Sequence, residues 1–116
     1  MSLKVKTYPG YGRGVYTTKA IRKGKRILKS ETLLLPYEDV LTIKELCNYV
    51  FSYDEQSDCL VLGIGSLLNH SKKPNCKATQ YMKNGRLIMY YKTIKEIKKG
   101  EQLFIDYGYD PNEYEE

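Results

Sequence analysis

The sequence predicts a mostly β protein of short strands with one helix, which pattern alone would arrange as a small barrel or sandwich. Three observations support this fold class. Most apolar residues fall in short β-prone runs that glycine, proline and asparagine separate. The pair Asn84-Gly85 stands between two such runs and is a strong hairpin signal. The best helix candidate is the segment 40–52, where apolar residues recur at helical spacing.

The first strands surround a glycine-rich segment. We expect one strand over 5–8, interrupted at Pro9-Gly10, and a second over 15–18. Between them, alternate residues are glycine, and backbone without a Cβ can take positive φ and approach a ligand closely. The segment lacks the Lys-Ser/Thr of a P-loop, and the chain is too short and too poor in βαβ signals for a dinucleotide-binding domain.

The middle of the chain places the helix among further strands. The expected elements, in order, are a turn at 23–25, strands at 26–28 and 32–35, the helix at 40–52 and a polar loop at 54–58. The apolar positions of the helix are Val40, Ile43, Leu46, Cys47, Val50 and Phe51. Thr42 is followed three residues later by Glu45, a possible capping box.

The last third of the chain predicts a hairpin and a final strand. Strands at 76–82 and 87–93 flank the turn 83–86, and the final strand covers 102–107. The chain shows no internal repeat, low-complexity segment or linker. We therefore expect one domain over residues 1–116, with a core at 3–109 and a short acidic segment at 110–116.

Composition limits the classes of protein that remain. Apolar residues make up 41% of the 116 residues, enough for a modest core. The chain has no apolar run of about 18 residues and lacks the long apolar region of a signal peptide, so we expect a cytoplasmic or nuclear protein that does not enter a membrane. The three widely spaced cysteines and single histidine predict buried reduced thiols and no metal site.

The net charge of +5 is unevenly distributed. Residues 1–30 hold nine Lys or Arg and no acid, whereas residues 101–116 hold six acids and no Lys or Arg. Two interpretations stay open. The two ends could form a field that orients a charged partner, or they could be solvated faces that keep a small protein soluble.

An Asn-His-Ser corner organises the centre of the chain. His70, the only histidine, lies between Asn69 and Ser71, directly after an apolar stretch, and Pro74-Asn75 then turns the chain. Asn and Ser side chains favour turns because they hydrogen-bond nearby backbone. In isolation these residues predict a capped turn that holds a core histidine.

Two further motifs change that interpretation. The glycine-rich segment 10–16, followed by 21–24, precedes the corner, and Lys99-Gly100-Glu101-Gln102-Leu103-Phe104-Ile105-Asp106-Tyr107-Gly108 follows it. Together with the Asn-His-Ser-x-x-Pro-Asn-Cys run, these motifs resemble, in order, those of SET-domain protein lysine methyltransferases. The resemblance covers nearly all of the chain. The cysteine-rich zinc segments that flank many SET domains are absent, so the chain is similar to the minimal SET domains of small viral histone methyltransferases.

The resemblance implies a specific fold. SET domains have a β-clip-like fold of small curved sheets with a short helix, and their C-terminal segment passes beneath a loop to form a pseudoknot, an exception to the general avoidance of threading. This topology would bring the Asn69-His70 corner against Asp106-Tyr107, although 36 residues separate His70 from Asp106.

The resemblance also implies a cofactor site. SET enzymes transfer a methyl group from S-adenosylmethionine to a lysine ε-amine by in-line displacement, and their main catalytic gain is alignment. The matching cofactor-binding residues are Tyr11, Gly12, Arg13, Asn69, His70 and Tyr107. Asn69 and His70 would act largely through backbone groups, so we do not expect His70 to be a general base.

Lysine must lose its proton before it attacks. An unperturbed pKa near 10.4 leaves roughly one lysine in a thousand neutral near pH 7.4, a handicap of about 4 kcal/mol. A narrow aromatic channel beside a sulfonium lowers that pKa. Tyr107 matches the family's catalytic tyrosine, and Tyr49 matches a second tyrosine that lines the channel. Tyr109 and Tyr114 could form a channel wall.

Ile105 occupies the position two residues before Tyr107, where many SET enzymes carry Phe or Tyr. Isoleucine is smaller and has no hydroxyl to hold a water, so we expect that di- or trimethylation is permitted unless another tyrosine, such as Tyr81, fills the space.

The leading interpretation is an enzyme that methylates lysine in a basic protein or peptide, such as a histone or another chromatin or ribosomal-type protein. Two alternatives stay open: a catalytically silent SET-like module that binds peptide, and a small basic β protein that binds nucleic acid through residues 1–30. A homodimer is compatible with the sequence, because a second subunit could supply missing surface.

Overall fold

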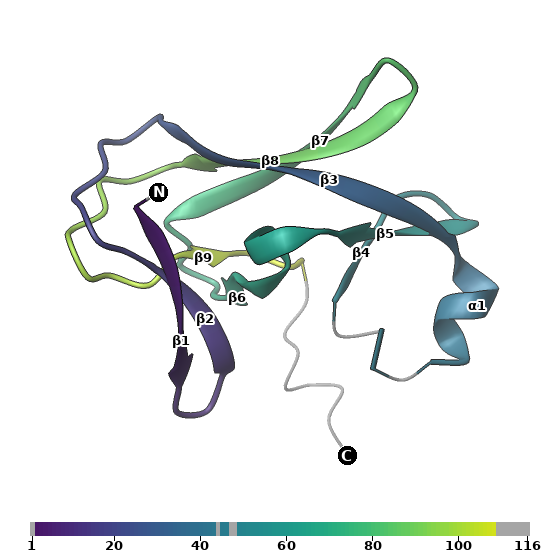
Figure 1. Ribbon diagram of the computed structural model, residues 1–116, viewed down its shortest axis with the longest axis horizontal. Helices are drawn as coiled ribbons and strands as arrows, with labels where there is room; N and C mark the ends of the chain where they lie inside the picture. The colour runs from purple at the N-terminus through teal and green to yellow at the C-terminus, as the bar shows by residue number, and fades with distance from the viewer. Residues whose placement is uncertain (1, 44, 47–48, 109–116) are drawn as a thin grey trace.

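A strongly curved, five-stranded antiparallel sheet forms most of the molecule (Figure 1). The computed structural model describes residues 2–43, 45–46 and 49–108. In spatial order the strands of the sheet are β4 (Val50–Ser52), β5 (Ser57–Val61), β3 (Arg26–Pro36), β8 (Arg86–Thr93) and β7 (Cys76–Lys83). The two short strands predicted at 26–28 and 32–35 are therefore parts of one long strand. This strand pairs with β8 through its first half and with β5 through its second half.

The β7–β8 hairpin forms where the Asn-Gly signal predicts it. Asn84 and Gly85 have φ of 50° and 78°, and positive φ at both central residues is the mark of a type I′ turn, whose twist matches that of the flanking strands. Each strand extends one residue further toward the turn than predicted, because Lys83 pairs with Arg86.

Two smaller sheets lie beside the large one. Strands β1 (Leu3–Tyr8) and β2 (Gly12–Thr17) form an antiparallel hairpin; strands were predicted here at 5–8 and 15–18, so β1 begins two residues earlier and β2 takes in part of the glycine-rich segment. Strands β6 (Asn69–His70) and β9 (Phe104–Ile105) form a parallel pair. Leu103 N–H donates to the Val15 carbonyl at 2.8 Å and so ties the segment before β9 to the β1–β2 hairpin. The β6–β9 pair lies between that hairpin and the large sheet (Figure 1).

The helix predicted over 40–52 is wrong in its bounds. Helix α1 covers only Tyr37–Leu41, and residues 50–52 form strand β4; residues 44, 47 and 48 lie outside the described residues. Thr42 does not cap a new helix, because its hydroxyl donates back to the Asp39 carbonyl at 2.7 Å. Further on, Phe51 pairs with Cys59 across the sheet. For β-branched and aromatic residues this cross-strand packing outweighs helical spacing.

Two other elements differ from the sequence prediction. A 3₁₀-helix, η2 (Gly63–Leu67), leads into the Asn-His-Ser corner. The final strand is shorter than the predicted 102–107, because only Phe104–Ile105 form β9, and Gln102 makes an isolated bridge to Tyr16.

The core packs residues of the large sheet against residues of the two smaller sheets. Its buried residues are Leu3, Val15, Cys59, Val61, Leu68, Cys76, Leu87, Met89, Tyr91, Ile97, Leu103 and Ile105. Cys59 and Cys76 are free thiols, as predicted for them, and burial raises the pKa of Cys76 to about 12. Cys47 lies outside the described residues. In the described part of the chain, no helix is long and apolar enough to cross a membrane.

Candidate active site

The C-terminal segment is held against the Asn-His-Ser corner by two asparagines. The Asn69 amide donates to the Arg13 carbonyl at 3.2 Å and to Gln102 Oε1 at 2.8 Å. The Asn75 amide donates to the Gln102 carbonyl at 2.9 Å, and its Oδ1 accepts the Phe104 N–H at 2.8 Å. Side chains from the corner loop therefore satisfy the backbone of the segment that leads into β9. The predicted meeting of the corner with the strand end at 106–107 is confirmed.

The imidazole of His70 positions the strand end. Its Nδ1 accepts the backbone N–H of Tyr107 at 3.0 Å. In the neutral imidazole the proton is therefore on Nε2. Asp106 Oδ1 lies 3.7 Å from the same Nδ1 but accepts the Gly108 N–H at 2.8 Å, so it does not form the primary contact. The resemblance implied that His70 acts largely through its backbone, and this side-chain contact was not predicted.

The phenol of Tyr107 has a defined orientation. Its hydroxyl donates to the Leu68 carbonyl at 2.5 Å. One side of the ring faces His70, with ring centroids 5.2 Å apart, and the edge-to-face contact with Phe51 has centroids 6.1 Å apart. A hydroxyl oxygen and a backbone carbonyl oxygen thus converge at one point beside buried Leu68. Two such oxygens can orient a methyl group through weak C–H···O contacts.

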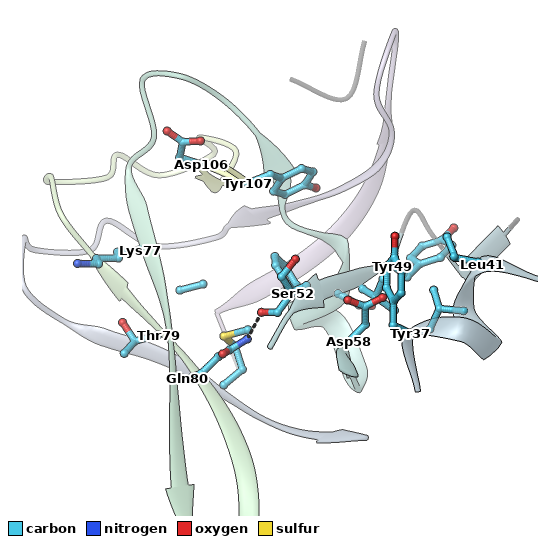
Figure 2. A pocket seen from close by; sticks show the side chains of 16 residues that line it. Tyr37, Leu41, Tyr49, Ser52, Asp58, Lys77, Thr79, Gln80, Asp106 and Tyr107 are labelled. Carbon is cyan, nitrogen blue, oxygen red and sulfur yellow. Dashed lines mark hydrogen bonds between the residues drawn. The ribbon is translucent and has the colours of Figure 1, made fainter. Parts of the chain in front are cut away.

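Tyr107 lines a pocket of about 690 Å³ that the curved sheet partly encloses (Figure 2). The two edge strands of the sheet, β4 and β7, contribute opposite walls, and Gln80 Nε2 donates across the gap to the Ser52 carbonyl at 3.2 Å. Helix α1 closes a further side. The lining residues are Tyr37, Val40, Leu41, Tyr49, Val50, Phe51, Ser52, Asp58, Ser66, Lys77, Ala78, Thr79, Gln80, Met89, Asp106 and Tyr107.

Of the residues predicted to contact the substrate lysine, some line the pocket and others do not. Tyr49 lines the pocket with 39% of its surface exposed. Ile105 belongs to the core, with 1% exposed, and is not among the residues that line the pocket. Tyr81 packs against Tyr90, with ring centroids 5.4 Å apart, and also does not line the pocket. Tyr109 and Tyr114 lie outside the described residues.

The predicted cofactor residues gather around β6 and β9. Gly12 has φ of 79°, and no atom lies within 4 Å of the place where a Cβ would be, so its backbone is open to a ligand. Tyr11 is exposed, and its ring lies 5.8 Å from that of Phe104. The carbonyl of Arg13 is the one that Asn69 contacts.

Two buried polar atoms near this corner have no hydrogen-bond partner among the described residues. They are Tyr8 Oη and His70 Nε2. Burial, and secondarily the neighbouring Tyr16, raises the pKa of Tyr8. Unpaired buried donors are costly, so a polar ligand that accepts from them would stabilise the corner. Together with the open Gly12 backbone, these atoms fit a polar small-molecule cofactor. In the described residues, no three His, Cys, Asp or Glu side chains gather as metal ligands.

Gly14 has a packing role in this corner, which predicts a large effect of substitution. A Cβ at Gly14 would lie 2.6 Å from Gln102 Oε1 and 2.7 Å from Asn69 Nδ2, so Gly14→Ala forces these two hydrogen-bonded side chains apart. We expect a loss of about 1–3 kcal/mol in the free energy of unfolding, measured by urea denaturation. Gly10→Ala, where the added Cβ meets nothing, is the comparison and should cost only about 1 kcal/mol of backbone strain. A smaller loss for Gly14→Ala than for Gly10→Ala would contradict this packing role.

Three groups that contact the predicted site residues were not predicted from the sequence. Phe51 packs on Tyr107 but was assigned to the helix 40–52. The Leu68 carbonyl belongs to an ordinary apolar residue, so residue type carried no signal for it. Gln102, which accepts from Asn69, lies within a recognised motif, but its partner is distant in sequence. A β-prone Val-Phe-Ser run at 50–52 was the one signal that could have placed Phe51 on a strand.

Comparisons with known proteins agree with this geometry. The SET domain profile matches residues 12–108. The chain is 33% identical over 109 residues to a Schizosaccharomyces pombe protein named "Histone-lysine N-methyltransferase, H3 lysine-37 specific", with 91% of this chain and 73% of the relative covered. It is 28% identical over 120 residues to an N-lysine methyltransferase of Danio rerio, with 91% of this chain covered but only 35% of that relative's length.

A solved structure shares the fold. The crystal structure of a Plasmodium falciparum protein, named as a candidate histone methyltransferase, superposes with a TM-score of 0.79 at 24% identity and covers 95% of this chain and 96% of that one. This likeness concerns the fold alone. The profile match across most of the chain, the relative at 33% identity and the arrangement of the three motifs around Tyr107 agree: the chain belongs to the SET domain family.

Proposed function

We propose that this protein is an S-adenosylmethionine-dependent protein lysine N-methyltransferase that acts on lysine in a basic protein tail. The observation that carries the proposal is the convergence of the Tyr107 hydroxyl and the Leu68 carbonyl at a pocket with aromatic walls. Membership of the SET family and relatives named as histone-lysine methyltransferases support it. The substrate class is a histone or another chromatin or ribosomal-type protein, which would be met in the cytoplasm or nucleus.

The glycine-rich turn and the Asn-His-Ser corner would hold the cofactor. The open backbone at Gly12 suits the approach of a polar group, and the unpaired Nε2–H of His70 can donate to one. When bound, S-adenosylmethionine would supply a methyl group made electrophilic by its sulfonium. Because His70 Nδ1 already accepts from Tyr107, the imidazole would act as a positioning group, linking the cofactor corner to the strand end.

The pocket would prepare the lysine. Aromatic side chains line the end that contains Tyr107 and Phe51, and they would exclude water from an inserted lysine stem. Desolvation lowers the pKa of an ammonium, which raises the fraction of neutral, nucleophilic amine. The Tyr107 oxygen would then accept a hydrogen bond from the amine and fix its direction of attack.

A direct assay tests the proposal. The purified chain would be incubated with labelled S-adenosylmethionine and a panel of histones and ribosomal proteins, and the products identified by mass spectrometry. We expect labelled methyl-lysine in at least one basic protein. Heat-denatured protein is the control for non-enzymatic methylation. Binding of cofactor without label on any protein in the panel would favour the silent peptide-binding module.

The number of methyl groups transferred gives a second prediction. Ile105 stands two residues before Tyr107, lacks a hydroxyl and is buried in the core outside the pocket lining, so this position supplies neither bulk nor a water-binding oxygen in the way of a methylated amine. With excess cofactor we expect a lysine peptide to proceed to di- or trimethyl-lysine, followed by mass spectrometry over time. Ile105→Val, a small change in a residue that is 1% exposed, should leave the product pattern unchanged. A wild-type reaction that stops at monomethyl-lysine would refute the prediction.

A further inference from the structure

Asp58 is an unusual buried carboxylate. It lies on β5 with 8% of its surface exposed, and its carboxylate has no hydrogen-bond or ion-pair partner among the described residues. Burial raises its pKa. Aspartate is almost never this deeply buried unless it is paired, because desolvating an unpaired charge is costly. The part of the chain that the structure describes therefore offers this acid no counter-ion.

The carboxylate opens on the candidate substrate pocket. Asp58 lines one end of it together with Tyr37, Leu41 and Tyr49, while Tyr107 lies at the other (Figure 2). Asp106 also lines the pocket, but it is exposed, lies near Tyr107 (Figure 2) and accepts the Gly108 N–H, whereas Glu55 is exposed and does not line the pocket. A cation that entered the pocket would meet this carboxylate on a side chain with little surface open to bulk water.

The strand register relates Asp58 to the position of Tyr107. Ser52 pairs with Asp58, and Phe51 pairs with Cys59. Because successive side chains of a strand point to opposite faces, Phe51 and Asp58 lie on opposite faces of the β4–β5 ribbon. Phe51 packs on Tyr107, so the phenol lies on the Phe51 face of the ribbon. Asp58 is on the opposite face, and all three residues line the pocket. The pocket therefore extends around the edge strand β4 from one face to the other.

An extended peptide in this pocket would direct side chains toward both faces of the β4–β5 ribbon. Strand β4 is an edge of the sheet, and an edge strand offers backbone groups to an added strand. In a peptide strand beside β4, a lysine directed toward Tyr107 would have neighbours directed toward the face of Asp58. Two strand spacings, roughly 10 Å, would separate such a neighbour from the Asp58 backbone. A long side chain is needed to cover that distance.

We propose that Asp58 forms a subsite that binds the guanidinium of an arginine next to the target lysine. This inference rests on the proposed function. A planar guanidinium can bind one carboxylate through two hydrogen bonds and is more weakly hydrated than an ammonium, so it suits a desolvated acid better than lysine does. The exposed rings of Tyr37 and Tyr49 can cover its stem and face, which adds cation–π attraction.

The test compares peptides that differ in one charge. Two peptides with a single lysine carry either arginine or citrulline, its neutral analogue, on each side of that lysine. For the wild-type protein we expect kcat/KM to be about 10- to 100-fold higher for the arginine peptide, the range for a hydrogen bond to a charged group. In Asp58→Asn this ratio should fall to about one, whereas Glu55→Gln, which removes the same charge from the exposed β4–β5 loop, should keep it.

Binding and stability measurements separate the two proposals. Fluorescence anisotropy of labelled versions of both peptides reports the preference for arginine without methyl transfer. If no peptide is methylated but the binding preference is present and is lost in Asp58→Asn, the proposed activity fails and the subsite stands. Asp58→Asn should also unfold at the same or a higher urea concentration, because it removes an unpaired buried charge. Equal binding of the two peptides by the wild type, or a ratio that survives in Asp58→Asn, would overturn the subsite.

Discussion

Replacing Tyr107 with phenylalanine is expected to abolish methyl transfer and to leave the fold intact. The phenylalanine ring keeps the contacts with Phe51 and His70, and its backbone N–H still donates to His70 Nδ1. Only the hydroxyl that donates to the Leu68 carbonyl is lost. Loss of one orienting group should lower kcat at least about 100-fold, the scale associated with misplacing reacting atoms. The loss in the free energy of unfolding should be about 1–3 kcal/mol, because the carbonyl of buried Leu68 loses this donor.

Single-turnover methylation and urea denaturation of the same preparation measure the two effects. Tyr81→Phe is the matched control, because that ring packs against Tyr90 and does not line the pocket. It should retain wild-type activity. A Tyr107→Phe protein that transfers methyl groups at near the wild-type rate would remove the observation on which the proposed function rests.

Replacing Asn75 with alanine is expected to destabilise the protein and the site together. The change removes the hydrogen bond to the Gln102 carbonyl and leaves the Phe104 N–H without its acceptor. One lost hydrogen bond and one unsatisfied, partly buried amide together predict a loss of about 1–3 kcal/mol in the free energy of unfolding. Because these bonds hold the segment that carries Tyr107, methyl transfer should fall even where most molecules remain folded.

Urea denaturation gives the stability change, and hydrogen exchange at the Phe104 amide reports whether the strand end opens locally. Ser71→Ala is the comparison in the same loop, since among the described residues the one hydrogen bond of its hydroxyl is accepted from the exposed Lys73 N–H. It should cost less than about 1 kcal/mol. A loss for Asn75→Ala no larger than that for Ser71→Ala would show that the asparagine does not hold the C-terminal segment.

Local elements were predictable where short-range chemistry decides them. The Asn84-Gly85 turn forms because positive φ at both residues suits a tight hairpin, a condition that two adjacent residues satisfy by themselves. The β-prone runs at 5–8 and 15–18 likewise marked strands β1 and β2, although their bounds and their pairing came only from the structure. The helix at 40–52 failed for the opposite reason. Its apolar spacing suited a helix, but Val50 and Phe51 pair with β5, a partner that helical spacing cannot reveal.

The order of three short motifs was enough to identify the family and to single out Tyr107, Asn69 and His70, because these residue types recur at set positions along the chain. Only the folded chain decided how they act. The His70 imidazole accepts the Tyr107 backbone N–H, and the Leu68 carbonyl meets the phenol, across 37 and 39 residues of sequence. The sequence also could not predict that Asp58 lines the pocket with no partner among the residues that the structure describes. A contact between distant segments depends on strand register and sheet curvature, which arise from the packing of the whole core and not from any local pattern.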